Sequence, residues 1–139
     1  MSIAYIPHHT AISVRDLDKS VKFYELLGYK QVHRYDEADG SMSIVHLRLG
    51  SSYLEIFAYK QNENEPALNY KSANNLEEIG VKHLALSTDD IEAALEDLRK
   101  KGLADDSTKI TFGRTKVSYF FIKDPDGAWV EIVKDDRYN

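Results

Sequence analysis

The order of apolar and polar positions in the first half of the chain predicts a strand, a helix and three further strands. Within residues 10–14, Thr10, Ile12 and Val14 alternate with Ala11 and Ser13, which is the two-residue period of a half-buried strand. Apolar residues then recur at helical spacing from Leu17 to Leu27, and Gly28 supplies a stop at the end of that helix. A three-strand meander is expected over residues 29–36, 42–49 and 53–59, with a tight turn at 50–52.

The second half of the chain repeats this order of elements. His9-Thr-Ala-Ile-Ser matches His83-Leu-Ala-Leu-Ser at a shift of 74 residues. Tyr53-Leu-Glu-Ile-Phe matches Trp129-Val-Glu-Ile-Val at a shift of 76 residues. Internal repetition of this kind indicates two copies of one structural unit. We therefore expect two βαβββ modules, about 8–59 and 82–134, within a single domain over residues 1–139.

The second module is expected to begin its helix with a capping box formed by Asp89 and Glu92. Its meander is predicted over residues 110–112, 117–123 and 128–133, with a turn at Asp124-Pro-Asp-Gly. The linker between the modules, residues 60–80, is polar and long for a compact domain. We therefore expect this linker to be either partly helical or a functional lid.

Composition narrows the classes of function. The net charge of −5, from 18 basic and 23 acidic residues, has the wrong sign for general nucleic-acid binding. No apolar run approaches the roughly 18 residues of a membrane span, so no membrane partner is expected. The chain has no cysteine, which excludes disulfides and thiolate ligands and fits a cytoplasmic location. The net charge says little about a small-molecule site, which can be locally basic inside an acidic protein.

Two histidines and two glutamates occupy matching positions in the two modules. His9 and His83 lie at the start of the first strands, whereas Glu55 and Glu131 lie within the last strands between apolar neighbours. A glutamate in an apolar strand is costly to bury unless it is paired. Two imidazoles and two carboxylates suit one divalent metal ion per site, namely Zn, Ni, Fe, Co or Mn. His8 competes with His9, but only His9 aligns with His83.

These segments resemble the vicinal oxygen chelate superfamily, the glyoxalase, bleomycin-resistance and dioxygenase group. The resemblance covers almost the whole chain and includes Phe23-Tyr24 and Asp124-Pro-Asp-Gly before Glu131. It implies an α+β fold, in which two tandem βαβββ modules form an open, cup-shaped mixed sheet. It also implies a homodimer and a metal site made of His9, Glu55, His83 and Glu131, as in glyoxalase I-like members. The sequence leaves open whether these four ligands meet within one chain or across the dimer.

The resemblance further implies a metal-dependent lyase or isomerase. In glyoxalase I the metal holds vicinal oxygens of the substrate and stabilises an enediolate while a metal-bound glutamate moves the proton. Carried over, Glu131 is the base and Glu55 is its partner. The chain departs from the bacterial glyoxalase pattern at Ser13 and Tyr59, where an Arg and an Asn would hold glutathione. Serine cannot replace the bidentate guanidinium clamp, so another small oxygenated substrate, or another thiol conjugate, is expected.

Strand pairing suggests further residues around the substrate. A two-residue turn after Gly50 places His46 and Arg48 on the face of Glu55. If the second hairpin has the same parity, the face of Glu131 carries Arg114, Lys116 and Phe120, of which the two cations could hold an anionic group. Solvated or salt-bridged strand residues are the competing interpretation for all four charged positions.

Three other activities of the superfamily compete with the glyoxalase type. Epoxide-opening enzymes of the fosfomycin-resistance type, a transferase or hydrolase class, use two histidines and one glutamate. Ring-cleaving dioxygenases use the same three ligands, and Glu55 counts against both classes. Drug-sequestering proteins of the bleomycin-resistance type need no metal ligands. The complete set of four therefore favours the metal-dependent lyase or isomerase.

Overall fold

The computed structural model describes residues 2–67, 70–72 and 75–137 of the chain. The chain divides into two compact units, Met1–Glu65 and Pro66–Asn139. Each unit contains a four-stranded mixed sheet and one α-helix, in the order βαβββ. The predicted repeat of this order is thus confirmed, whereas the single domain stays a prediction. No helix in the described ranges is long and apolar enough to cross a membrane.

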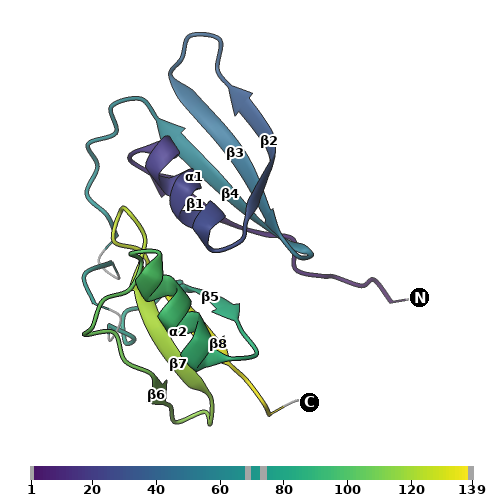
Figure 1. Ribbon diagram of the computed structural model, residues 1–139. Helices are drawn as coiled ribbons and strands as arrows, with labels where there is room; N and C mark the ends of the chain where they lie inside the picture. The colour runs from purple at the N-terminus through teal and green to yellow at the C-terminus, as the bar shows by residue number, and fades with distance from the viewer. Residues whose placement is uncertain (1, 68–69, 73–74, 138–139) are drawn as a thin grey trace. The chain divides into compact units, whose positions relative to one another are not determined.

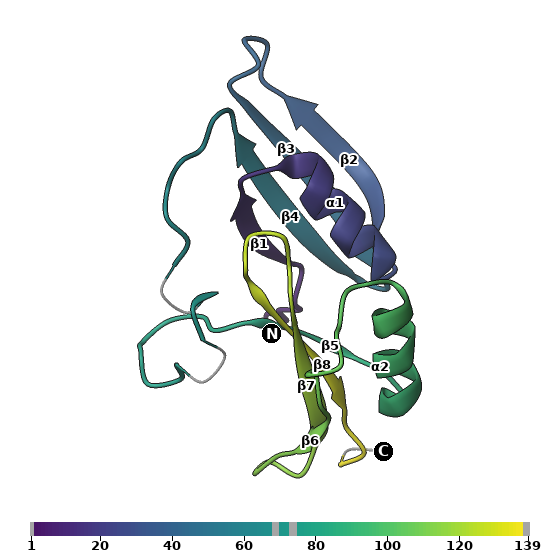
Figure 2. The ribbon, with the colours of Figure 1, turned by 60° about the vertical axis from the view of Figure 1, so that its left-hand side comes forward.

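Unit 1 is built from five elements that follow the predicted order. The helix α1 (Leu17–Leu26) connects β1 (His9–Val14) to a meander of β2 (Lys30–Asp36), β3 (Met42–Leu49) and β4 (Ser52–Tyr59). The strand order is β1-β4-β3-β2, in which β1 and β4 are parallel and the other pairs are antiparallel. Figures 1 and 2 show α1 lying across one face of this sheet.

The two faces of the unit 1 sheet have different surroundings. Leu54 and Ile56 on β4, and Val45 and Leu47 on β3, are fully buried on the face that α1 covers. Because successive strand residues point to opposite faces, Glu55 lies on the other face. Buried side chains of α1, Phe23 and Tyr24, complete the core.

Unit 2 repeats this plan with shorter edge strands. The helix α2 (Ile91–Lys100) connects β5 (Leu84–Ser87) to β6 (Thr111–Phe112), β7 (Ser118–Lys123) and β8 (Trp129–Lys134). The strand order is β5-β8-β7-β6, with β5 parallel to β8. The core combines residues of the helix with residues of β7 and β8, namely Ile91, Leu95, Leu98, Phe120, Ile122, Val130 and Ile132.

One local prediction is wrong. The N-cap of α2 is Asp90, whose carboxylate accepts from the backbone N–H of Ala93 at 3.0 Å, and not Asp89. Asp90 has the extended backbone that an N-cap requires, and the residue three positions later is Ala93 rather than a glutamate, so no capping box forms. The described residues of the linker, 60–67, 70–72 and 75–80, contain no α-helix, but Tyr70 lies in a 3₁₀ turn in which its N–H donates to the carbonyl of Ala67 at 2.9 Å. The partly helical linker and the lid therefore both remain predictions.

Candidate functional site

The first candidate pair, His9 and Glu55, lies on two parallel neighbouring strands of unit 1. Glu55 on β4 pairs in register with Ala11 on β1, and His9 precedes Ala11 by two residues. His9 therefore lies on the same face as Glu55, because strand side chains repeat every two residues. The Nε2 atom of His9 is 3.7 Å from the Oε1 atom of Glu55.

The second pair, His83 and Glu131, has the same arrangement in unit 2. Glu131 on β8 pairs in register with Ala85 on β5, and His83 precedes Ala85 by two residues. The Nε2 atom of His83 is 2.7 Å from the Oε2 atom of Glu131. Both side chains are half-buried. The internal repeat of the sequence thus corresponds to an identical strand register in the two units.

The donor atoms of both pairs, an imidazole nitrogen and a carboxylate oxygen, are of the types that a divalent transition metal binds. Two ligand atoms that bind one ion at about 2.1 Å lie roughly 3 to 3.5 Å apart. The two N–O distances, 3.7 Å in unit 1 and 2.7 Å in unit 2, lie on either side of that range. Among the described residues no group of three or more His, Asp or Glu side chains could hold an ion. The four-ligand site accordingly stays a prediction, and each unit contributes one imidazole and one carboxylate to it.

His8 contacts His9 rather than replacing it. The Nδ1 atoms of the two rings are 2.8 Å apart, so one of them donates a hydrogen bond to the other. His8 is also stacked on Tyr53, with ring centroids 5.0 Å apart and planes inclined by 21°. These contacts engage the Nδ1 side of His9 and leave its Nε2 side toward Glu55. This geometry favours His9 as the ligand and gives His8 the place of a supporting residue.

The predicted face of His46 and Arg48 is confirmed, and the two side chains have different contacts there. His46 pairs in register with Glu55, and its Nε2 atom is 2.6 Å from the Oε2 atom of that glutamate. Arg48 donates from Nε to the carbonyl of Gly50 at 2.8 Å, and its guanidinium lies 5.8 Å from the centre of the Tyr53 ring. Arg48 thus braces its own turn, whereas His46 directly contacts a candidate ligand.

Ser13 and Tyr59, the positions that differ from the glutathione-binding pattern, line one pocket of unit 1. This pocket has a volume of about 450 Å³ and is completed by the start of the linker, residues 60–64. Ser13 lies on the same face of β1 as His9, and Tyr59 lies on the same face of β4 as Glu55. Their joint role in substrate binding stays a prediction.

The expected face of Phe120 is wrong. Phe120 pairs with Ile132 and is 1% exposed in the core, whereas the residue opposite Glu131 is Phe121. Arg114 and Lys116 lie in the turn between β6 and β7, so strand alternation does not assign them to either face. The cause is the loop of five residues between Lys123 and Trp129, which gives the second hairpin the opposite parity to the first.

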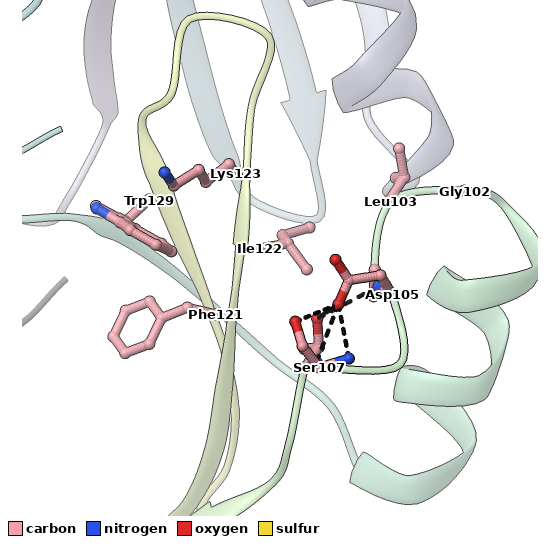
Figure 3. A pocket seen from close by; sticks show the side chains of 10 residues that line it. Gly102, Leu103, Asp105, Ser107, Phe121, Ile122, Lys123 and Trp129 are labelled. Carbon is pink, nitrogen blue, oxygen red and sulfur yellow. Dashed lines mark hydrogen bonds between the residues drawn. The ribbon is translucent and has the colours of Figure 1, made fainter. Parts of the chain in front are cut away.

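A second pocket lies in unit 2 and was not anticipated from the sequence. It has a volume of about 440 Å³ and lies between β7, the start of β8 and the loop that follows α2. Figure 3 shows Asp105 and Ser107 on its loop side and Lys123 beside Trp129. The Nζ atom of Lys123 is 4.5 Å from the centre of the Trp129 ring, a cation–π distance. Hydrogen bonds from Ser107 hold the pKa of Asp105 below its usual value.

Two further residues near the candidate ligands could not be identified from the sequence pattern alone. His33 lies across from His46 in the neighbouring strand, with ring centroids 5.7 Å apart. A register shift between Gln31 and His33 obscures this pairing in the sequence. Phe121 packs edge-on against His83 with centroids 5.0 Å apart, and its place follows only from the length of the second hairpin loop.

Comparisons with known proteins agree with this architecture. The sequence profile of the Glyoxalase/Bleomycin resistance protein/Dioxygenase superfamily matches residues 6–132. A lactoylglutathione lyase of Schizosaccharomyces pombe is 32% identical over 135 residues, which are 91% of this chain and 44% of that enzyme. This chain therefore spans less than half the length of the yeast protein. The mitochondrial methylmalonyl-CoA epimerase of Homo sapiens is 28% identical over 128 residues, covering 90% of this chain and 71% of the epimerase.

A solved structure shows the same fold. The glyoxalase family protein from Enterococcus faecalis superimposes with a TM-score of 0.72 at 28% identity, covering 91% of this chain and 94% of that protein. The predicted α+β, glyoxalase-like fold class is confirmed by this likeness together with the two four-stranded mixed sheets.

Proposed function

Because the chain belongs to the Glyoxalase/Bleomycin resistance protein/Dioxygenase superfamily, we propose that it is a divalent-metal-dependent lyase or isomerase. Its substrate would be a small oxygenated molecule, with thiol conjugates included. The named relatives comprise a lyase and an epimerase, which are the two reaction types that the proposal covers. The proposed ligands are His9, Glu55, His83 and Glu131, brought together within one chain or across a homodimer.

The observation that carries this proposal is the equal register of the two His–Glu pairs. In each unit the histidine lies two residues before the strand residue that pairs with the glutamate. A solvent-facing histidine or glutamate is common on a sheet, but chance would not place both at the same register in two modules. Pairs of nitrogen and oxygen donors at matched positions are the ligand set that a transition metal requires.

The chemistry assigned to the site is proton transfer next to a carbonyl group. A divalent ion bound there would stabilise the negative charge that develops on the oxygen of the substrate. Glu131 would accept the proton on its carboxylate and return it, as a general base and then a general acid. Its half-buried side chain can reach a substrate without being fully solvated. Glu55 would remain a ligand, and the two imidazoles would bind through Nε2.

Metal analysis of protein purified without chelator or affinity tag tests the proposal. We expect about one equivalent of a transition metal per chain, its loss in His83→Ala and its retention in the control His33→Ala. His33 is a histidine on the same face of the unit 1 sheet as Glu55, and it is not one of the proposed ligands. Exchange of the substrate's α-proton with deuterated water would then be screened on carbonyl compounds in the metal-loaded protein.

The absence of bound metal after addition of nickel, zinc and manganese would overturn the proposal. A protein that binds small molecules without metal would be a sequestering module of the bleomycin-resistance type. Metal-dependent epoxide opening without proton exchange would instead indicate the fosfomycin-resistance type of enzyme.

A further inference from the structure

We propose that His46 is a positioning residue that fixes the carboxylate of Glu55 in one orientation for metal binding. The inference rests on the proposed function, because it concerns one of the proposed ligands. His46 itself is not among the four ligands that the internal repeat indicates, and its counterpart in the second module is not a histidine.

The two oxygens of Glu55 face different imidazoles. Its Oε2 atom is 2.6 Å from Nε2 of His46, whereas its Oε1 atom is 3.7 Å from Nε2 of His9. An ionised carboxylate only accepts hydrogen bonds, so Nε2 of His46 is the donor. This bond occupies one oxygen and leaves the other on the side of His9. Glu55 is thereby prepared to bind an ion through Oε1 together with His9.

The strand that carries His46 is itself firmly held. His46 lies between Val45 and Leu47, both fully buried, and it pairs in register with Glu55 on the neighbouring strand. Its side chain is only 35% exposed, and the ring of His33 packs against it from β2. A hydrogen bond to an ionised group in such a half-buried place is stronger and better directed than one in open solvent.

The corresponding place in unit 2 lacks this hydrogen bond. The residue opposite Glu131 is Phe121, whose ring has no donor and packs edge-on against His83. The two proposed ligand carboxylates are therefore held differently: Glu55 contacts His46, which is not a proposed ligand, whereas Glu131 contacts Nε2 of His83, the atom proposed to bind the ion, at 2.7 Å. With an ion bound by His83, Glu131 would keep no donor on β7. A fixed carboxylate suits a permanent ligand, and a less restrained one suits a base that must move a proton.

Two substitutions at this position separate positioning from ligation. His46→Phe copies the residue of unit 2, and His46→Gln retains an N–H donor of similar reach. Zinc affinity would be measured by competition with a chromophoric chelator, and thermal unfolding of the metal-free proteins would show that each variant is folded. We expect zinc to bind about 10- to 100-fold more weakly to His46→Phe, and His46→Gln to recover most of that loss. The matched control His33→Phe, which replaces the outer imidazole by a phenyl ring, should bind zinc as the unaltered protein does.

Each other result contradicts the inference in a recognisable way. Unchanged zinc affinity in His46→Phe would show that Glu55 needs no such support, and the proposed function would stand. Equal losses in His46→Phe and His46→Gln would make His46 a ligand rather than a positioning residue. An equal loss in His33→Phe would assign the effect to the sheet as a whole. If the unaltered protein binds no zinc, nickel or manganese, the proposed function and this inference both fail.

Discussion

A glutamate in the middle of an apolar strand is compatible with folding here because its neighbours and its own side chain point to opposite faces. Leu54 and Ile56 are fully buried beneath α1, while Glu55 between them is directed away from the core. The desolvation cost of a fully buried charge is thereby reduced, because the carboxylate stays half-buried. The same holds for Glu131 between Val130 and Ile132 in unit 2. Each candidate ligand is thus positioned by a core that it does not itself enter.

A carboxylate outside the candidate site, that of Asp135 after β8, should contribute to the pH dependence of stability in the acidic range. Arg137 donates from Nε to Oδ1 at 2.9 Å and from Nη2 to Oδ2 at 2.8 Å, and its backbone N–H donates to Oδ1 at 3.0 Å. Chiefly the side-chain bonds, with the backbone bond second, lower the pKa of Asp135 from 3.8 to about 2. Because the pKa is lower in the folded state, the stabilisation is complete above pH 4. It is lost as the pH falls from about 4 to about 2. The destabilisation caused by Arg137→Gln should shrink over the same interval, as followed by urea unfolding.

Carboxyl titration by NMR supplies the direct measurement for Asp135. In Arg137→Gln the pKa of Asp135 should rise toward 3.8. The pKa of Asp39, which hydrogen bonds from Ser41 hold below its usual value, should stay low in the same variant and serves as the internal control. An Asp135 pKa that remained near 2 without Arg137 would contradict the assigned cause.

At the scale of elements, the turns decide which residues reach the candidate ligands. The hairpin of unit 1 closes at Leu49 and Ser52, and this short turn is evident from the sequence, so the face of His46 could be predicted. The hairpin of unit 2 closes at Lys123 and Trp129 around a longer loop. There the carboxylate of Asp124 accepts from the backbone N–H groups of Asp126 and Ala128, which sets the loop length.

The order of elements along the chain and the matching of the two His–Glu pairs could be predicted, because the sequence shows the internal repeat and the two-residue period of the strands. The sequence predicts the wrong face for Phe120. The residue types at Asp124-Pro-Asp-Gly indicate a turn, but they do not give the number of residues that the turn encloses. A difference of one residue there reverses every side chain of β7. The pairing of His33 with His46 is likewise not predictable from the sequence, because an irregularity in β2 shifts the register of that strand.

The start of α2 gives a prediction at this scale. Asp90, not Asp89, accepts from the N–H of Ala93, so Asp90→Ala should lower the free energy of unfolding by about 1 kcal/mol. The adjacent variant Asp89→Ala removes the same charge without the cap and should change it by less than about 0.5 kcal/mol. Urea unfolding of the metal-free proteins measures both. Equal losses in the two variants would show that charge near the helix end, and not the capping hydrogen bond, is responsible.

At the scale of the whole molecule, the proposed ligands are divided equally between the two units. His9 and Glu55 belong to Met1–Glu65, whereas His83 and Glu131 belong to Pro66–Asn139. An ion with four protein ligands needs both pairs, since two ligands alone form an incomplete site. Metal binding should therefore couple the stabilities of the two units.

Hydrogen exchange with and without metal tests this coupling. A metal at about 100 times its dissociation constant stabilises the folded state by about 2.7 kcal/mol, so exchange should slow in β1 and β4 of unit 1 as well as in β8 of unit 2. In His83→Ala, a change confined to unit 2, the metal-dependent protection of unit 1 should also disappear. His33→Ala should retain the protection of both units. If unit 1 remained protected by metal in His83→Ala, its own pair would bind an ion without unit 2, and one shared ion would be excluded.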